Sequence, residues 1–342
     1  MRESLRVVRR MAAKLPCFFW FVLLFGAGGL VLFIHLEDLS EMVQRQEPDP
    51  TGVNLRSPPR QSKEETWRRI AVVQEARRRL VKQVCAKFKS SMDRTIMQHH
   101  VSRIYVEDNY KILFCEVPKA GCTNWKRILL VLDGLASSTQ IHHEKVHNSV
   151  LRTLNTFQQK DITKRLQTYT KMLVVREPLQ RLVSAYRDKF ENPNVYYHPR
   201  FGIPIISKYR ANASKDALMT GHGVTFQEFI QYLLDVYRPV GMDIHWESVN
   251  QLCHPCLLDY DFIGKFENIE EEADFLLRMM GAPGNLTLPT FKDKNPDDER
   301  TSMHVTHQYF AQINASDIQR VYDYYYMDYL MFNFSKPYKD LY

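Results

Sequence analysis

The sequence predicts an α/β fold in which helices flank a central parallel sheet, preceded by one membrane-spanning helix. Beyond residue 101, short apolar runs alternate with helical patterns, which is typical of strands that lie parallel in one sheet. Nearer the N-terminus, residues 15–34 form an uncharged, mostly apolar run of twenty residues, long enough to cross a bilayer. The chain therefore divides into a tail (1–14), a signal anchor (15–35), a stem (36–94) and a globular domain (95–342).

The charges on either side of the apolar run predict its orientation. Arginines precede the run, whereas Glu37, Asp38 and Glu41 follow it, so the positive-inside rule places the tail in the cytosol and the domain in a lumen. A cleaved signal peptide is the alternative, but the run is longer than the apolar segment of most signal peptides. Four N-glycosylation sequons agree with a lumenal domain: Asn212, Asn285, Asn314 and Asn333.

The net charge of +7 describes the tail and the stem more than the globular domain. Residues 1–14 carry +4 and residues 60–89 carry +7, which leaves −4 for the rest of the chain. Because the excess positive charge lies in the tail and the stem, it gives little support to nucleic-acid binding by the globular domain. We therefore expect no nucleic acid among the partners.

The expected elements begin with a basic amphipathic helix over residues 64–89. This helix packs on the domain or forms a stem coiled coil, and binding to a membrane surface is the alternative. An aromatic run over 322–334 indicates a core helix more than a platform for sugar stacking. Between them we expect strands at 102–106, 112–117, 171–175 and 263–266 and helices at 124–135, 164–170, 178–190, 226–236 and 269–280.

The strand 112–117 leads into a tight loop, 118–124, with the features of an anion site. Because a helix begins near Asn124 or Trp125, free backbone N–H groups and the positive end of its dipole converge on the loop. Lys119 adds a cation, and Thr123 and Asn124 add neutral donors. The loop predicts a site for phosphate or sulfate, although it does not match the G-x-x-x-x-G-K-[ST] pattern of P-loop kinases.

A second anion site is predicted at the end of the strand 171–175. Arg176 stands at the tip of this strand, and Ser184 lies nearly two turns into the helix that Pro178 opens. The guanidinium can make a bidentate, charge-assisted contact with a phosphate that the serine helps to orient. A local ion pair between Arg176 and Glu177 is the alternative. Together the two strand ends would hold two separated phosphate groups.

The two segments read Phe-Cys-Glu-Val-Pro-Lys-Ala-Gly-Cys-Thr-Asn-Trp-Lys-Arg (114–127) and Val-Arg-Glu-Pro-Leu-Gln-Arg-Leu-Val-Ser-Ala-Tyr-Arg-Asp-Lys-Phe (175–190). They resemble the paired signatures of Golgi carbohydrate sulfotransferases of the HNK-1 type. The likeness covers about residues 100–342 and includes motifs at 245–246, 253–256, 264–267 and 329–333. Further motifs resemble N-acetylgalactosamine 4-O-sulfotransferases of the pituitary-hormone type: 101–108, 191–194, 196–199, 239–245 and 335–342. Leu179-Gln180 departs from the Phe-Glu of many relatives.

The resemblance implies a P-loop-like sulfotransferase fold that uses PAPS (3′-phosphoadenylyl sulfate) as the sulfate donor and needs no metal. It implies that the first signature binds the 5′-phosphosulfate, through Pro118, Lys119, Ala120, Gly121, Cys122, Thr123 and Asn124. It also implies that the second signature binds the 3′-phosphate, through Arg176, Glu177, Pro178, Leu179, Gln180, Arg181, Leu182, Val183 and Ser184.

The acceptor that the resemblance implies is a terminal N-acetylgalactosamine in GalNAcβ1-4GlcNAc, on the N- or O-glycans of glycoproteins. The enzyme would sulfate its 4-hydroxyl as a single-pass type II protein of the Golgi membrane. Chondroitin or dermatan chains are the alternative acceptor. Those chains are polyanions, so the net negative charge outside the tail and stem favours the neutral glycan.

Two residues are predicted to do the chemistry. Lys119 would stabilise charge on the leaving phosphate, since sulfuryl transfer makes demands similar to those of phosphoryl transfer. A histidine is the usual base near neutral pH, and His147 is our choice because related sequences have a histidine at the matching place. His142 and His143 are weaker candidates, and a structural role for His147 is the main alternative.

Several pairings of the cysteines are compatible with the sequence. An oxidising lumen permits disulfides among Cys85, Cys115, Cys122, Cys253 and Cys256, and leaves at least one of the five unpaired. Cys253 and Cys256 have zinc-knuckle spacing, but no second C-x-x-C accompanies them. A local disulfide or a structural turn is therefore the prediction there.

Two other classes of protein were weighed against an enzyme of this kind. A membrane-anchored glycan-binding protein without turnover has no use for a site that holds two phosphates, so Lys119, Arg176 and Ser184 argue against it. A nucleotide kinase is disfavoured by the missing P-loop motif and by the predicted lumenal position of the domain.

Overall fold

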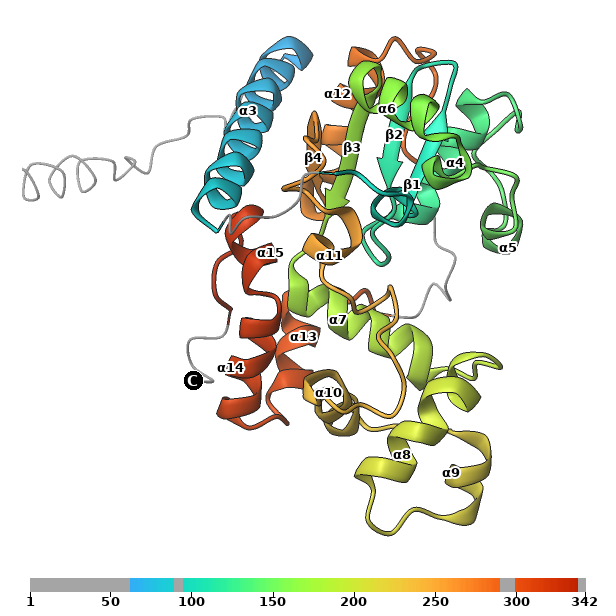
Figure 1. Cartoon of the computed structure of the whole chain (residues 1–342), viewed down its shortest axis with the longest axis vertical. Helices are drawn as coiled ribbons and strands as arrows, with labels where there is room; N and C mark the ends of the chain where they lie inside the picture. The colour runs from blue at the N-terminus through green and yellow to red at the C-terminus, as the bar shows by residue number, and fades with distance from the viewer. Residues whose placement is uncertain (1–61, 89–94, 290–298, 338–342) are drawn as a thin grey trace, which may run out of the picture. The chain divides into compact units, whose positions relative to one another are not determined.

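The computed structural model describes residues 62–88, 95–289 and 299–337, which belong to one compact unit, Gln61–Tyr342 (Figure 1). The predicted cytoplasmic tail (1–14) and signal anchor (15–35) lie outside these residues. No helix in the described ranges is both long and apolar enough to cross a membrane.

Four short strands form one sheet in the order β1-β2-β3-β4: Ile104–Glu107, Ile112–Cys115, Thr170–Val175 and Phe262–Lys265. The strands β2, β3 and β4 are parallel, with Phe114 opposite Met172 and Leu173 opposite Ile263. Strand β1 is antiparallel to β2, so the sheet is mixed, with the predicted parallel strands at its centre and one antiparallel strand at this edge. The reason is a tight connection that ends at Lys111, with a φ of 57°, which turns the chain straight back.

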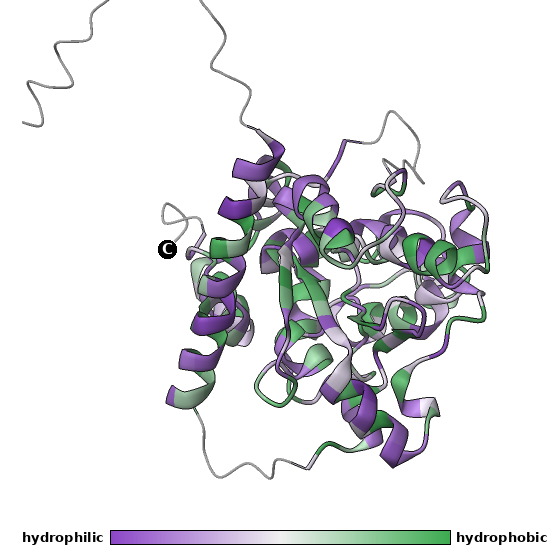
Figure 2. Ribbon diagram, turned by 90° about the horizontal axis from the view of Figure 1, so that it is seen from above, coloured by the Kyte–Doolittle hydropathy of each residue, from purple (hydrophilic) through white to green (hydrophobic). Residues whose placement is uncertain are grey.

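The sheet forms the centre of the first hydrophobic core. Every residue of β2 is buried, and Figure 2 shows the strands mainly in the green of hydrophobic residues. Helix α4 (Cys122–Leu132) packs on the sheet through Trp125, Ile128 and Leu129. The predicted helix 124–135 ends earlier, at Leu132, and Leu135 beyond it is 48% exposed.

Helix α3 (Lys63–Lys87) lies beside the free edge of strand β4 (Figure 1). The Gln74 side chain accepts from the Ile263 N–H at 2.9 Å and donates to the Ile263 carbonyl at 3.1 Å, as a neighbouring strand would. Arg77 forms a bidentate pair with Glu272 of helix α12 (Ile269–Met279) at 2.8 Å. The helix predicted at 64–89 is therefore packed on the sheet domain.

A second core surrounds helix α7 (Pro178–Tyr186), which continues directly from β3 and ends in a π-helical turn, η3 (Arg187–Glu191). Trp246 is 0% exposed at its centre and contacts several aromatic rings: Phe190, Tyr197, Phe201, Phe229 and Tyr232. The helices around it are α8 (Ile203–Tyr209), α10 (Phe226–Leu234), α13 (Met303–Phe310) and α14 (Ala315–Tyr324).

The remaining elements are short. The predicted helix 164–170 begins earlier, as α6 (Gln159–Thr168), and the aromatic run 322–334 is helical over parts of α14 and α15 (Tyr326–Met331). The others are η1 (Gln98–Val101), α5 (His143–His147), η2 (Leu154–Thr156), η4 (His198–Gly202), α9 (Lys215–Thr220), α11 (Val249–Cys253) and η5 (Phe266–Asn268).

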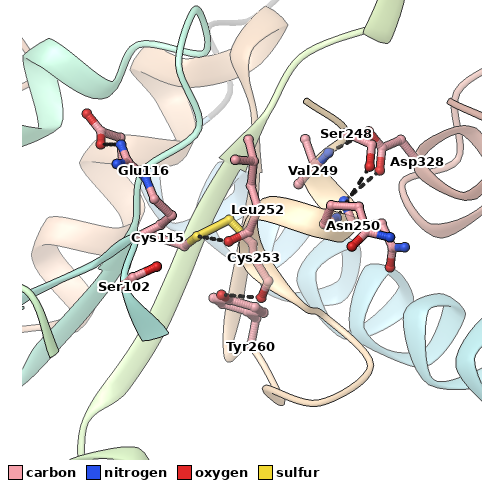
Figure 3. The surroundings of a disulfide bond; sticks show 12 residues. Ser102, Cys115, Glu116, Ser248, Val249, Asn250, Leu252, Cys253, Tyr260 and Asp328 are labelled. Carbon is pink, nitrogen blue, oxygen red and sulfur yellow. Dashed lines mark hydrogen bonds and ion pairs between the residues drawn. A yellow bond between two sulfur atoms is a disulfide. The ribbon is translucent and has the colours of Figure 1, made fainter. Parts of the chain in front are cut away.

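Two disulfides connect distant parts of the chain. Cys85 of α3 pairs with Cys256, and Cys115 at the end of β2 pairs with Cys253 of α11 (Figure 3). A local disulfide between Cys253 and Cys256 was one of the predictions there, and it is wrong because each cysteine has a partner elsewhere. Cys122 is the free cysteine of the described residues, and it is buried in the first loop.

Removal of the Cys115–Cys253 disulfide tests its contribution to stability. This bond closes a loop with a sequence separation of 138 residues, so Cys115→Ala/Cys253→Ala should lower the free energy of unfolding by about 4 kcal/mol. Urea denaturation of the full chain in detergent measures this change. The control Cys122→Ala removes a thiol but no cross-link and should cost about 1 kcal/mol. If both variants lowered the free energy of unfolding equally, the proposed contribution of the disulfide to stability would be contradicted.

Candidate active site

The first loop follows β2 and has a strained backbone. Lys119 has a φ of 69° and Gly121 a φ of 82°, both in the left-handed region. This conformation costs Lys119 about 1 kcal/mol, since only glycine adopts it freely, and such strain concentrates at functional sites. Glycine is needed at 121 because a Cβ there would lie 2.7 Å from the Ile269 side chain.

Helix α4 starts at Cys122, two residues earlier than predicted. The Asn124 and Trp125 N–H groups donate to the Gly121 carbonyl at 3.1 and 3.3 Å, whereas the N–H groups of Cys122 and Thr123 have no hydrogen-bond partner among the described residues. These two groups lie at the positive end of the helix dipole, so the loop can bind an anion. The Asn124 side chain was expected to donate to that anion. Instead it donates to the Pro289 carbonyl at 3.0 Å and accepts from Arg127 at 2.7 Å.

The structure brings the second strand end into direct contact with the first loop. Arg176, which is 6% exposed, donates to the Lys119 carbonyl at 3.1 Å and to the Thr301 carbonyl at 2.5 Å. Its guanidinium also lies over the Phe266 ring, 4.7 Å from the centroid. Because β2 and β3 are adjacent and parallel, both loops extend from the same end of the sheet.

The electrostatics at Arg176 fit an anionic group. Burial lowers the pKa of its guanidinium to about 10, although the nearby carboxylates of Glu267 and Glu177 oppose this change. Its Nε atom is buried without a hydrogen-bond partner in the described part of the chain. At the end of α7, Arg187 Nε lies 3.5 Å from the Glu191 carboxylate, so that guanidinium already has a counter-charge. A phosphate beside Arg176 would supply the acceptor that its Nε atom lacks.

Several residues of the second signature are buried in the core or cap helix α7. Leu179, Leu182 and Val183 are buried in the second core, and Pro178 is also buried as the first residue of α7. Glu177 caps this helix by accepting from the Gln180 N–H at 2.7 Å. Burial raises the pKa of Glu177, which also accepts a hydrogen bond from the Tyr329 hydroxyl. The local ion pair of Glu177 with Arg176 is not among the contacts of the described residues.

Ser184 is half-buried on helix α7, and its hydroxyl has no hydrogen-bond partner within the described residues. It lies one turn before Arg187, which donates to the Thr301 hydroxyl at 2.9 Å. Arg176 contacts the carbonyl of the same Thr301. Arg176 and Ser184 therefore lie on the same side of the site. The Ser184 hydroxyl is available there as a hydrogen-bond donor.

Lys119 and His147 both lie at the first loop. The Lys119 ammonium is 3.2 Å from Asp188 of η3, and the Thr123 hydroxyl is 3.1 Å from His147 Nε2. His147 is exposed, yet loss of water around its ring and the charge of Lys126 lower its pKa to about 4. His147 is therefore neutral near pH 6, the form that a general base needs. His142 and His143 contact each other, with ring centroids 4.4 Å apart.

The sequence analysis missed a second histidine beside these residues. His245 Nδ1 is 2.6 Å from the Asp243 carboxylate and 3.0 Å from the Tyr197 hydroxyl. Its neighbour Tyr197 lies under the Lys189 ammonium, which contacts Asp188, and Asp188 in turn contacts Lys119 of the first loop. Its segment was noted only for its resemblance to a motif. The spacing of Asp243 two residues before His245 was the available signal.

The four predicted glycosylation sites are all exposed: Asn212, Asn285, Asn314 and Asn333. Asn314 also caps helix α14, since its side chain accepts from the Asp317 N–H at 2.8 Å. The described residues contain no group of three or more His, Cys, Asp or Glu placed to hold a metal ion.

Comparison with known proteins gives consistent matches. A family model described as "Sulfotransferase family" matches residues 102–335. The chain is 47% identical to carbohydrate sulfotransferase 8 of Mus musculus, over 96% of this chain and 98% of that protein. It is 55% identical to carbohydrate sulfotransferase 9 of Homo sapiens, over 81% of this chain and 63% of that one. Carbohydrate sulfotransferase 11 of Mus musculus is 35% identical, over 92% of each chain. No solved structure matches this chain.

Proposed function

The chain belongs to the sulfotransferase family, and we propose that it transfers sulfate from PAPS to the 4-hydroxyl of terminal N-acetylgalactosamine in GalNAcβ1-4GlcNAc glycans of glycoproteins. The observation that carries the proposal is the contact of Arg176 with the backbone of Lys119. This contact joins two anion-binding strand ends into one site, as a donor with two separated phosphate groups requires.

The first loop holds the 5′-phosphosulfate in this proposal, and the second signature holds the 3′-phosphate. The backbone N–H groups after Gly121, together with Thr123, bind the phosphosulfate oxygens. Arg176 and Ser184 bind the 3′-phosphate, whereas the buried apolar residues of the signature fix helix α7 beneath it. A buried guanidinium with an unpartnered Nε atom supports this division of roles.

PAPS supplies the sulfuryl group when it is bound. Lys119 stabilises the negative charge that develops on the phosphate as the bond from sulfur to the phosphate oxygen breaks. His147 takes the proton from the acceptor hydroxyl as the new bond from oxygen to sulfur forms. The hydrogen bond between His147 and Thr123 supports this role, because it keeps the imidazole next to the loop that carries Lys119.

The acceptor in this proposal is a neutral glycan. The globular domain (95–342) carries a net charge of −1, so it has no excess of basic side chains for the polyanionic chains of chondroitin or dermatan. We infer that the enzyme resides in the Golgi membrane as a single-pass type II protein. The exposure of all four sequons supports a lumenal domain that carries N-glycans.

An assay with two acceptors tests the proposed function. The full-length chain in detergent is incubated with sulfur-labelled PAPS and either GalNAcβ1-4GlcNAc or desulfated chondroitin. We expect labelling of the disaccharide at O4, at least tenfold faster than labelling of the polymer. Preferential labelling of the polymer would overturn the acceptor assignment, and no labelling of either would overturn the enzyme assignment.

His147→Ala tests the proposed base. Loss of a general base lowers kcat by a factor on the order of 100 to 10,000, while the affinity for PAPS should stay within a fewfold. Because the pKa of His147 lies at about 4, wild-type kcat/KM should stay level from pH 7 to pH 5 and fall only near pH 4. The exposed neighbour His142 provides the control His142→Ala. Near-full turnover by His147→Ala with normal PAPS binding would exclude this role.

A further inference from the structure

Three side chains that the donor site does not use form a polar cluster next to it. Asp243 and His245 lie 2.6 Å apart, and the Tyr197 hydroxyl is 3.0 Å from His245 Nδ1 and 3.4 Å from the Asp243 carboxylate. His245 is 19% exposed and Asp243 is 15% exposed, so both side chains reach the surface. We name Asp243, His245 and Tyr197 the 243/245/197 cluster.

A continuous chain of contacts joins the 243/245/197 cluster to Lys119. The Lys119 ammonium lies 3.2 Å from Asp188, which is also 3.0 Å from the Lys189 ammonium. Lys189 in turn lies over the Tyr197 ring, 4.6 Å from its centroid. Three successive contacts therefore connect Lys119, the residue proposed to stabilise the leaving phosphate, to the cluster.

The fold holds the backbone of this segment in place. Arg181, from the helix of the second signature, donates to the His245 carbonyl at 3.2 Å and also to the Glu247 carbonyl. Between these two positions, the buried Trp246 ring anchors the segment in the second core, and its carbonyl accepts from the Tyr325 hydroxyl at 2.5 Å. The side chain of His245 is thus presented from a rigid support, as a binding group should be.

The hydrogen bonds also fix the protonation state of the cluster. Burial lowers the pKa of His245, and the bond to Asp243 opposes this change only in part. Burial alone would raise the pKa of Asp243, but the hydrogen bonds from His245 and Tyr197 outweigh it, and the result is a lowered pKa. A neutral imidazole that donates from Nδ1 to Asp243 leaves Nε2 as an acceptor. No hydrogen bond to Nε2 is found among the described residues.

An exposed aromatic ring borders the cluster. Tyr196 is 53% exposed, and its ring lies edge-on to that of Tyr197 with centroids 5.0 Å apart. The preceding residue, Val195, is 98% exposed. A few fixed polar groups beside an open aromatic face match a sugar ring, which offers hydroxyls around its edge and an apolar C–H face.

We propose that the 243/245/197 cluster and Tyr196 form the subsite for the acceptor sugar. His245 Nε2 accepts a hydrogen bond from a ring hydroxyl of a neutral hexosamine, and the Tyr196 ring packs on its C–H face. The Asp243 carboxylate is balanced here by the cations of Lys189 and Arg200, which lie over the Tyr197 and Tyr196 rings, so charge alone does not call for an anionic sugar. The inference rests on the proposed function, since it places the acceptor of that reaction next to Lys119.

Two pairs of variants test the subsite in the full-length chain, with labelled PAPS and GalNAcβ1-4GlcNAc. His245→Asn keeps a donor toward Asp243 but removes Nε2, so the acceptor KM should rise about tenfold. Tyr196→Ala should raise the acceptor KM severalfold, whereas the matched Tyr196→Phe keeps the ring and should not. The KM for PAPS and kcat should change less than threefold in all of them. The control His304→Asn, at an exposed position on α13, should match wild type.

Acceptors that lack single ring hydroxyls identify the contact. An acceptor that lacks the hydroxyl bound by His245 should raise the acceptor KM of wild type by the same factor as the substitution His245→Asn does. The same acceptor should not raise the KM of His245→Asn any further. If His245→Asn instead slowed turnover by two orders of magnitude or more, with an unchanged acceptor KM, the subsite would be overturned and His245 would be the base. A rise in the KM for PAPS alone would assign the cluster to the donor.

Folding and the proposed function are checked separately. Binding of 3′-phosphoadenosine 5′-phosphate by each variant shows that its donor site is intact. If His245→Asn fails this check, the pair Tyr196→Ala and Tyr196→Phe decides, and equal acceptor KM values for that pair would overturn the subsite. Absence of labelled product with wild type would instead overturn the proposed function.

Discussion

A single hydrogen bond, from the Arg176 guanidinium to the Lys119 carbonyl, ties the two strand-end loops into one site. It forms because β2 and β3 are adjacent and parallel, so that both strands end at the same edge of the sheet. Burial makes this guanidinium costly without a counter-charge, and a bound phosphate would offset that cost. This cost is the physical reason for proposing a phosphate next to Arg176.

Helix α7 extends this arrangement from the donor toward the acceptor. Its first turns carry the second signature, and Arg181 on the same helix fixes the backbone on both sides of Trp246. The helix then ends in the turn η3, whose Asp188 contacts Lys119. One rigid element thus connects the proposed sites for the 3′-phosphate, the leaving phosphate and the acceptor sugar, and small shifts of α7 should affect all three.

Local signals predicted the donor loops, because strand, tight turn and helix start are neighbours in the sequence. What they missed depends on tertiary contacts. The alternating pattern does not encode strand direction, so the reversal of β1 was not foreseen. The disulfide partners lie 138 and 171 residues apart, beyond the reach of spacing rules. His245 is linked to Lys119 through Asp188, Lys189 and Tyr197, and its carbonyl accepts from Arg181, but no periodicity in the sequence predicts these contacts.

The most direct test of a donor site shared by two loops compares two donors that differ only in the 3′-phosphate. Wild type should turn over PAPS faster than adenosine 5′-phosphosulfate, in kcat/KM, by a factor on the order of 100 or more, since a buried guanidinium contributes charge-assisted hydrogen bonds. In Arg176→Ala this ratio should fall at least tenfold, although Ser184 remains to contact the 3′-phosphate. Because the ratio compares two donors within one protein, a general loss of activity in the variant does not change it. A variant that keeps the wild-type ratio would contradict the account.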